Sequence, residues 1–177
     1  MGRLEARKNV KSLLQAFQIV VDEKPDAKLI IAGDGPDRQK LESYARRMEL
    51  QNVQFLGRVS EQKKLQLLHE SDLFCSPPMY GESFGVVLLE AMACQLPVVA
   101  GANPGYQAVL TGEGHNSLVD TTDIQAFATQ ILRFLDNPQL AKRWVGWAKE
   151  TVTQYDFRTV IDRYEAYYQD MVGVPII

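Results

Sequence analysis

The sequence has few of the side chains that build disulfide frameworks or metal centres, with two cysteines and two histidines in 177 residues. Cys75 and Cys94 each lie in an apolar run, where cysteine usually acts as a small core residue. His69 and His115 are far apart in the sequence, which favours surface roles. The sequence therefore offers no ligand cluster for a metal ion, and we expect no tightly bound metal cofactor.

Long apolar runs and a strong excess of one charge are also missing. No apolar run approaches the roughly 20 residues of a membrane span, and the opening residues MGRLEARKNV lack the apolar core of a signal peptide. The net charge of −3 is too balanced for non-specific nucleic-acid binding. We therefore expect one cytoplasmic, well-buried domain without a nucleic-acid partner.

Helical and strand patterns alternate along most of the chain. Ser60 can cap one helix, Thr122 or Asp123 can cap another, and Pro36 suits a first helical position. Short apolar runs indicate strands at 28–32, 53–56, 72–76, 97–100 and 117–119. Runs with a helical period indicate helices at 8–21, 37–48, 60–70 and 122–137. Strands of this kind between helices predict an α/β fold, with a doubly wound, Rossmann-like parallel sheet covered on both faces.

The end of the chain differs from this alternating part. From Leu140 onward the pattern is wholly helical and rich in tryptophan and tyrosine. We therefore divide the chain into an α/β domain, 1–137, and a helical tail, 138–177. We expect the tail helices to pack on the domain or on a neighbouring domain rather than to bind a cofactor.

The stretch GESFGVVLLEAMACQLPVVA places a helix after a predicted strand, where α/β proteins bind ligands. The helix should open near Gly85, and its N-terminus favours an anion such as a phosphate. Glu82 and Glu90 are eight residues apart. On one helix this spacing corresponds to about 12 Å along the axis and an angular offset of about 80°. Both carboxylates would then face one long ligand.

Carboxylates hold pairs of neighbouring hydroxyls, so Glu90 can hold a ribose and Glu82 a second polyol, with a diphosphate between them. This order of groups describes a nucleotide sugar. One helix end supplies only about half a charge, and Arg3 and Lys8 are the candidate cations for the diphosphate. The alternative is that all four are ordinary solvated charges.

Several motifs together resemble one family. They are GRxxxxK at Gly2, Arg3 and Lys8, AGDGP at 32–36, VQFLGRV at 53–59, and ESFGVVLLEAMA followed by PVVA. Over nearly the whole chain, the sequence resembles the C-terminal, donor-binding half of retaining glycosyltransferases of family 4, which have GT-B architecture. The resemblance implies that Glu82 contacts the donor sugar and Glu90 the ribose.

The same resemblance implies further roles. Arg3 and Lys8 would bind the diphosphate, with Arg3, Lys8 and Glu82 as the catalytic set. The implied donor-binding residues, beside Glu90, are Arg58 and Val59 at the base and Ser83, Phe84, Gly85 and Leu89 around the phosphates and sugar. Within the family the sequence looks most like bacterial phosphatidylinositol mannosyltransferases, whose relatives commonly use GDP-mannose. The donor is therefore expected to be GDP-mannose or a UDP-sugar, with no tightly bound cofactor.

Two departures from the family pattern bear on the rest of the protein. Segment 101–106, GANPGY, replaces a Gly-Gly-x-x-Glu pattern, and we assign it no role. Only Met1 precedes Gly2, where the family has an apolar strand. We therefore expect a fragment that lacks a strand near the middle of the sheet. Two neighbouring strand edges would be exposed, which predicts lower stability and self-association.

The missing half would hold the acceptor, a glycan or a lipid, together with any catalytic base. The isolated chain should then bind a donor weakly and turn over little. Association of the full-length protein with the inner face of the membrane is left open.

In retaining transfer, negative charge grows on the departing phosphate. Arg3, Lys8 and the helix N-terminus would stabilise that charge, while Glu82 orients the sugar rather than attacking it. One alternative is a nucleotide-sugar epimerase of the same architecture. Another is a non-enzymatic phosphoacceptor module, which needs an aspartate at the end of its third strand. That strand ends in Leu56-Gly57, and only Asp34 lies in a plausible turn.

Overall fold

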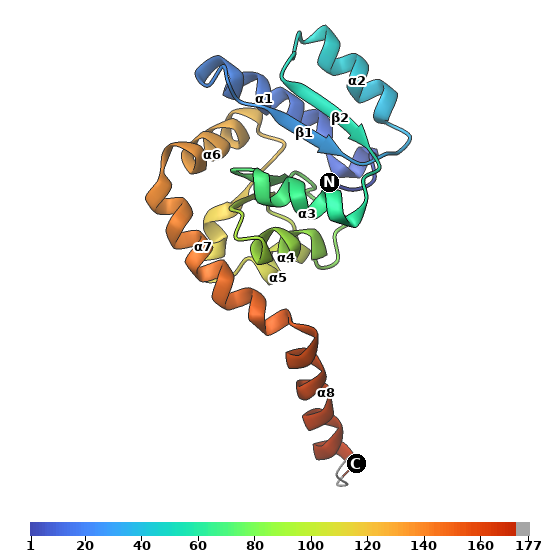
Figure 1. Ribbon diagram of the computed structural model, residues 1–177, viewed down its shortest axis with the longest axis vertical. Coiled ribbons are helices and arrows are strands. Elements are labelled where there is room, and N and C mark those ends of the chain that lie inside the picture. Colours follow the sequence, from blue (N-terminus) through green and yellow to red (C-terminus); the bar gives the residue numbers. More distant parts are fainter. Residues whose placement is uncertain (173–177) are drawn as a thin grey trace.

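The computed structural model describes residues 1–172, and it confirms a Rossmann-like arrangement of parallel strands with flanking helices (Figure 1). The strands are β1 (Leu29–Ala32), β2 (Val53–Gly57), β3 (Phe74–Ser76), β4 (Val98–Gly101) and β5 (Leu118–Val119). The helices are α1 (Val10–Glu23), α2 (Arg38–Arg47), α3 (Glu61–Glu70), α4 (Val86–Ala93), α5 (Pro104–Val109), α6 (Ile124–Asp136), α7 (Pro138–Val152) and α8 (Phe157–Val172). Short 3-10 turns are η1 (Ala6–Lys8), η2 (Gly112–Ser117) and η3 (Thr153–Tyr155).

The strands form two parallel ladders. One holds β1 and β2, and the other holds β3, β4 and β5 in that order. Within residues 1–172 no ladder joins β1 to β3, so each has one edge without a strand partner.

Side chains cap the helices largely where the sequence predicts. The Ser60 hydroxyl accepts from the Lys63 N–H at 3.2 Å and begins α3. Of the two candidates for α6, Asp123 is the cap, since its carboxylate accepts from the Ala126 N–H at 2.9 Å. Thr122 instead donates to the Asp120 carboxylate.

Some predicted element boundaries are wrong by one or two residues. The first helix begins at Val10 instead of residue 8, because Asn9 takes a left-handed conformation with φ of 50° and separates η1 from α1. Pro36 lies in the turn before α2, which begins at Arg38. Strand β3 begins at Phe74, two residues later than predicted. Segment 101–106, to which we assign no role from the sequence, ends in the first residues of the short helix α5.

The start of α4 corrects the geometry predicted for the two glutamates. Gly85 precedes the helix with φ of 89°, a left-handed value that suits glycine, and helical structure begins only at Val86. Glu82 therefore lies in the loop before α4, and Glu90 lies on the helix itself. The axial spacing of two residues on one helix does not apply to this pair.

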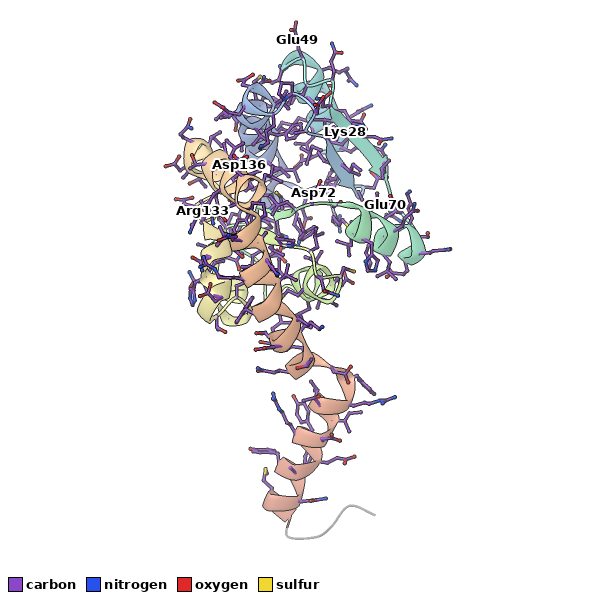
Figure 2. All side chains as sticks on the ribbon, turned by 60° about the vertical axis from the view of Figure 1, so that its left-hand side comes forward. Lys28, Glu49, Glu70, Asp72, Arg133 and Asp136 are labelled. Carbon is purple, nitrogen blue, oxygen red and sulfur yellow. The ribbon has the colours of Figure 1, made fainter. Side chains whose placement is uncertain are left out.

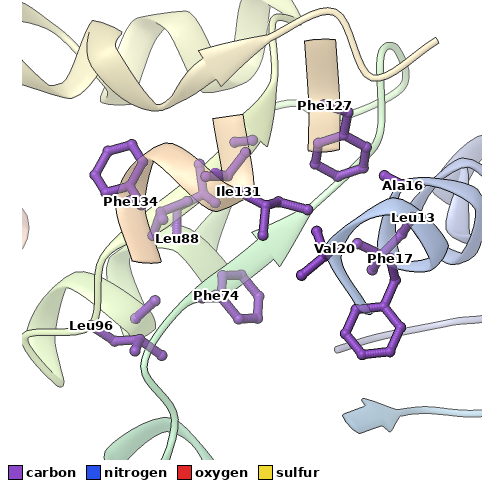
Figure 3. Packing of buried hydrophobic residues seen from close by; sticks show 14 of the residues in the cluster. Leu13, Ala16, Phe17, Val20, Phe74, Leu88, Leu96, Phe127, Ile131 and Phe134 are labelled. Atoms are coloured by element: carbon purple, nitrogen blue, oxygen red, sulfur yellow. The ribbon is translucent and has the colours of Figure 1, made fainter. Parts of the chain in front are cut away.

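One hydrophobic core connects both ladders. Helices α1 and α6 pack side by side, and Phe17 and Val20 of α1 converge with Phe74 of β3 (Figure 3). Helix α7 continues this core through Trp144, which is fully buried and packs edge-on against Phe134 at 6.4 Å between ring centroids. The core thus fixes the carboxyl ends of the strands relative to α4.

The last described helix does not lie on the domain. Helix α8 points away from the body, beyond η3 and the extended residue Asp156 (Figure 1). Its large apolar side chains, including Phe157, Tyr164 and Tyr167, are exposed. Among the residues described, α8 contributes no buried side chain to the core, so the expectation that the tail packs on the domain or on a neighbouring domain stays a prediction for α8. Residues 173–177 of the predicted tail lie outside the described residues.

Candidate active site

The loop 77–85 connects the carboxyl end of β3 to α4, and its first residues are fixed by side chains from distant elements. The Pro77 carbonyl accepts from the Thr121 hydroxyl at 2.5 Å, and Thr121 in turn accepts from the Asn9 amide at 3.1 Å. The Pro78 carbonyl accepts from the buried Asn103 amide at 2.8 Å. Asn103 also caps α5, so this short helix and the loop are positioned together.

Helix α5 forms the support on which the second half of the loop rests. A side chain at Gly105 would place its Cβ 2.2 Å from the Glu82 carbonyl oxygen, a distance that requires backbone movement. A Cβ at Gly85 would meet the Tyr106 ring at 2.7 Å. The Tyr106 hydroxyl shares a 2.7 Å hydrogen bond with Ser76, and burial raises the pKa of Tyr106 to about 12. Close backbone contact therefore determines where Glu82 lies.

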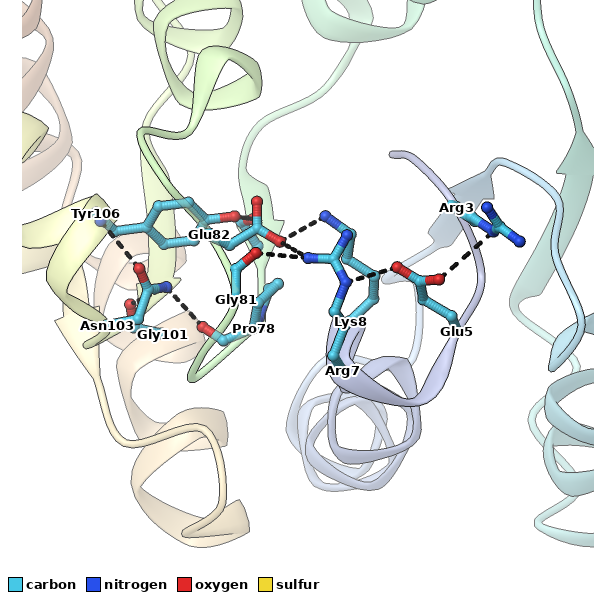
Figure 4. Close-up of polar contacts among 11 residues, drawn as sticks. Arg3, Glu5, Arg7, Lys8, Pro78, Gly81, Glu82, Gly101, Asn103 and Tyr106 are labelled. Atoms are coloured by element: carbon cyan, nitrogen blue, oxygen red, sulfur yellow. Dashed lines mark hydrogen bonds and ion pairs between the residues drawn. The ribbon is translucent and has the colours of Figure 1, made fainter.

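The Glu82 carboxylate lies between two cations from the start of the chain. Lys8 Nζ is 2.5 Å from Glu82 Oε1, and Arg7 donates to the same oxygen at 2.9 Å (Figure 4). Arg7 also donates to the Gly81 carbonyl at 2.7 Å. The Glu82 side chain is only 12% exposed, so solvent screens these ion pairs less than it would at the surface. The structure thus brings together Lys8 and Glu82, two of the predicted catalytic residues.

Arg3 is the predicted catalytic residue that does not join this cluster. Its guanidinium is 71% exposed and lies 3.4 Å from Glu5, which in turn pairs with Arg7 at 2.6 Å (Figure 4). Arg3 instead lines a cavity of about 540 Å³ together with Arg58, Val59 and the loop 33–35. Arg3 therefore lies in the same cavity as Arg58 and Val59, the predicted contacts of the base.

Glu90 belongs to a second charged cluster. Lys64 on α3 lies 2.7 Å from Glu90 Oε1 and 2.6 Å from Glu61. Hydrogen bonds from Lys64, to Glu61 first and to Glu90 second, raise the pKa of Lys64. Lys64 also lines the cavity that holds Arg58 and Val59. Glu90 therefore faces the side of the site where the base was predicted.

The two glutamates consequently have separate partners, which corrects the expectation of two carboxylates on one face of a helix. Burial lowers the pKa of the Met1 amine, with smaller opposing effects of Lys8 and Glu90. Residues 2–4 are fixed, with the Gly2 N–H donating to the Ala32 carbonyl at 3.0 Å. A Cβ at Gly33 would lie 1.8 Å from the Gly2 carbonyl oxygen, which explains the glycine at this position of the AGDGP motif.

The other predicted donor-binding residues surround the start of α4. Ser83 is exposed, and Phe84 is 39% exposed with its ring edge-on to Tyr155, 5.4 Å between centroids. Leu89 is half-buried and packs against the core, so the structure gives it a packing contact. No side chain caps α4, so no capping side chain accepts a hydrogen bond from the N–H groups of its first turn.

Sequence reasoning missed several residues that shape this region. Arg7 stands beside Lys8 in the sequence, and a second cation next to a predicted ligand was an available signal. The pair Asn103-Pro104 has the composition of a helix start, which could have predicted α5. Lys64 and Tyr106 carry no local signal, because only the fold brings them to the site.

Chemically, the arrangement suits a ligand that carries both negative charge and hydroxyl groups. The uncapped start of α4 and the cations Arg3 and Lys8 can hold phosphates, and the carboxylates Glu82 and Glu90 can accept from hydroxyls. The described residues contain no group of three or more His, Cys, Asp or Glu side chains placed to hold a metal ion. None of the helices found between residues 1 and 172 has the length and apolar character to cross a membrane.

Comparisons with known proteins agree with the resemblance of the sequence. The family "Glycosyl transferases group 1" matches residues 1–151. The chain is 36% identical, over 98% of its length, to phosphatidyl-myo-inositol mannosyltransferase of Mycobacterium tuberculosis, of which the match covers 47%. It is 34% identical, over 77% of its length, to the GDP-mannose-dependent monoacylated alpha-(1-6)-phosphatidylinositol monomannoside mannosyltransferase of Corynebacterium glutamicum, of which 37% is covered.

Solved structures agree on the fold. HepE from Anabaena in complex with UDP superposes with a TM-score of 0.81 at 23% identity, over 97% of this chain and 48% of that chain. A glycosyltransferase from Rickettsia africae superposes with a TM-score of 0.81 at 18% identity, over 96% of this chain and 46% of that chain. This chain spans about half the length of the curated relatives it matches. From its sequence match and its fold, the chain belongs to the group 1 glycosyl transferases.

Proposed function

We propose that this chain is the donor-binding half of a retaining glycosyltransferase, which transfers a sugar from a nucleoside-diphosphate sugar to an acceptor hydroxyl. One observation carries the proposal. Lys8 and Glu82, 74 residues apart in the sequence, meet at 2.5 Å beside the uncapped N-terminus of α4. A cation, a carboxylate and a helix N-terminus together suit a diphosphate that is linked to a sugar.

The donor would lie across the start of α4. Its diphosphate would contact Lys8, Arg3 and the N–H groups that follow Gly85, and its sugar would lie near Glu82. Its ribose would reach Glu90, and its base would enter the cavity at Arg58 and Val59. The 540 Å³ volume of this cavity, within the range of small-molecule pockets, supports its use by a nucleoside.

The catalytic step would depend on charge stabilisation. As the bond between sugar and phosphate lengthens, negative charge grows on the leaving diphosphate, and Lys8, Arg3 and the α4 N-terminus attract that charge. Glu82 has two cationic partners, Arg7 and Lys8, which keep its oxygens fixed by ion pairs. It would orient the sugar hydroxyls while the acceptor attacks on the face that the diphosphate leaves.

For the donor we propose GDP-mannose. The relatives at 36% and 34% identity are named as mannosyltransferases, and one of them as GDP-mannose-dependent. A structural neighbour in complex with UDP makes a UDP-sugar the alternative to be tested. The acceptor, a lipid or a glycan, would bind to a second half of the protein, in the cytoplasm and, for a lipid acceptor, at the inner face of the membrane.

Helix α8 has a role in the same proposal. Its exposed apolar side chains, among them Phe157, Tyr164 and Tyr167, need a partner surface to be removed from water. We propose that this surface belongs to the second half, so that the tail connects the two halves of a GT-B enzyme.

Calorimetric titration of GDP, UDP and ADP into the chain tests the site. We expect GDP to bind most tightly of the three nucleotides. Lys8→Met and Glu90→Gln should each weaken GDP binding about tenfold, because each removes one hydrogen bond that involves a charged group. The matched controls are Lys24→Met, which breaks a pair with Asp136, and Glu42→Gln, which breaks a pair with Arg38.

The controls separate the site from general effects of lost ion pairs. Unchanged affinity in both site variants, or an equal loss in the controls, would reject the proposed site. If UDP bound more tightly than GDP, and the site variants weakened UDP binding to the same extent, the proposed site would stand and a UDP-sugar would take the place of GDP-mannose as the proposed donor.

A further inference from the structure

The position of Lys8 relative to Glu82 depends on contacts between distant segments. Lys8 precedes α1 and Glu82 follows β3, and apolar packing between these parts of the chain is not directional. At the surface, Lys24 after α1 pairs with Asp136, which ends α6 (Figure 2). Exposed ion pairs of this kind contribute little, so the distance between Lys8 and Glu82 has to be set by polar contacts nearer the site.

Thr121, which follows β5, supplies such a contact in the interior. The residue is 0% exposed. Its hydroxyl donates to the Pro77 carbonyl at 2.5 Å and accepts from the Asn9 amide at 3.1 Å. Asn9 comes directly after Lys8, and Pro77 opens the loop that carries Glu82. One buried hydroxyl therefore links the segment of Lys8 to the loop of Glu82.

The turn before α6 directs Thr121 inward. The Asp120 carboxylate accepts from the Thr122 N–H at 2.9 Å and from the Thr122 hydroxyl at 2.6 Å, and Asp123 caps α6. Asp120 and Thr122 are exposed, whereas Thr121 between them is buried. These hydrogen bonds hold the turn and leave the Thr121 side chain little freedom.

Asn9 is held on its other side as well. Its amide oxygen accepts from the Ser12 hydroxyl at 2.7 Å, which leaves the amide nitrogen to face Thr121. The Asn9 backbone is left-handed, with φ of 50°, a conformation that asparagine adopts more readily than most residues. Lys8 is therefore joined to a residue whose side chain and backbone are both fixed.

We propose that Thr121 is a positioning residue of the donor site, whose hydroxyl holds Lys8 at hydrogen-bond distance from Glu82 and so sets how tightly a diphosphate binds. The effect on the diphosphate rests on the proposed function, whereas the effect on Lys8 and Glu82 does not. Without this hydroxyl, the Pro77 carbonyl and the Asn9 amide lose a shared buried partner. Such groups move or admit water to regain a hydrogen bond, and either response changes the distance between their segments.

Thr121→Val tests the proposal, because valine has nearly the shape of threonine and no hydroxyl. By calorimetric titration, GDP affinity should fall about fivefold, as expected for one lost hydrogen bond. Thr121→Ser retains the hydroxyl and should restore most of the affinity. Ser117→Ala is the matched control, because it removes a buried hydroxyl that has no hydrogen-bond partner among residues 1–172, and it should leave affinity unchanged.

The same substitution in a Lys8→Met background separates positioning from a general loss of structure. If Thr121 acts through Lys8, Thr121→Val should change the GDP affinity of Lys8→Met by less than about twofold. An equally large loss in that background would overturn the proposal. Full affinity in Thr121→Val, or the same loss in Thr121→Ser, would overturn it too.

A crystal structure of Thr121→Val without nucleotide keeps this test apart from that of the proposed function. We expect Lys8 Nζ to lie outside hydrogen-bond distance of Glu82, and an unchanged pair at 2.5 Å would overturn the proposal. If the unaltered chain failed to bind GDP, the proposed function would fall. A separated pair in Thr121→Val would then still support the positioning role of Thr121.

Discussion

At the scale of single residues, the site depends on a few side chains that each contact two distant segments. Arg7 is the clearest case, because one guanidinium contacts Glu5, the Gly81 carbonyl and Glu82. Its planar group makes several hydrogen bonds in fixed directions, which a lysine ammonium cannot reproduce. Arg7 therefore positions Glu82 and the loop before α4 while Lys8 remains able to contact a ligand.

Replacing Arg7 tests this positioning role. Arg7→Ala should weaken GDP binding about tenfold, since one hydrogen bond to a charged group is lost from a half-exposed site. Arg7→Lys should recover only part of the loss. Titration calorimetry measures both, and Arg46→Ala, which removes a single exposed hydrogen bond to Ser43, is the control. Wild-type affinity in Arg7→Ala would show that the contact has no part in binding.

The buried pair of Tyr106 and Ser76 should matter for stability. Tyr106→Phe leaves the Ser76 hydroxyl buried without this partner, which should lower the free energy of unfolding by about 1–3 kcal/mol. Urea denaturation measures the change. Adding Ser76→Ala to Tyr106→Phe should cost less than the sum of the single changes, because the two hydroxyls lose the same bond. Strict additivity would mean that the bond contributes nothing.

At the scale of elements, the contact of α5 with the loop 77–85 determines where the site opens. Gly105→Ala introduces a Cβ 2.2 Å from the Glu82 carbonyl oxygen, so the loop has to move. We expect this variant to bind GDP at least tenfold more weakly and to unfold at lower urea. Gly146→Ala is the matched control, because a Cβ at Gly146 in α7 meets nothing within 4 Å.

The control variant Gly146→Ala should not show the losses of affinity and stability expected for Gly105→Ala. Alanine is favoured over glycine inside a helix by about 0.5–1 kcal/mol, so Gly146→Ala should leave affinity unchanged and raise stability slightly. If Gly105→Ala also bound GDP normally, the loop would tolerate movement and α5 would not determine the position of Glu82.

Most elements could be predicted from the sequence because their signals are local. Ser60 and Asp123 cap helices through their own side chains, and the apolar run 97–100, predicted as a buried strand, overlaps β4. The start of α4 was less predictable, because Gly85 suits either a turn or a helix start. Its left-handed conformation depends on the close contact with Tyr106, which is distant in the sequence.

The site could be predicted in part, for the same reason. Lys8, Glu82 and Glu90 stand in recognisable motifs, and the fold brings Lys8 to Glu82. No local signal marks Lys64 as the partner of Glu90, because only tertiary packing brings α3 to α4. The exposed position of Arg3 likewise follows from its pairing with Glu5.

At the scale of the whole molecule, burial of the start of the chain influences how stability depends on pH. Burial of the Met1 amine, followed by the nearby charge of Lys8, lowers its pKa from the ordinary value of 8.0, while Cys75 and Glu90 act in the opposite direction. As pH falls through 8.0, the unfolded chain therefore binds this proton before the folded chain does. Stability should fall over that window and level off below the folded pKa.

Urea unfolding between pH 9.5 and 6 measures this dependence. Acetylation of the Met1 amine removes the titrating group, so the difference between the free and acetylated chains isolates its effect from other groups. We expect the free chain to lose more stability than the acetylated chain as pH falls. Parallel curves would show that the amine is solvated in the folded chain.

The central claim is that a diphosphate binds at the start of α4, between a sugar site at Glu82 and a ribose site at Glu90. A crystal structure of the chain with GDP tests this claim most directly. We predict the diphosphate within hydrogen-bond distance of Lys8 Nζ and the Val86 N–H, with the ribose hydroxyls on the Glu90 carboxylate. GDP bound elsewhere, with Lys8 still paired only to Glu82 and Glu90 only to Lys64, would contradict the account.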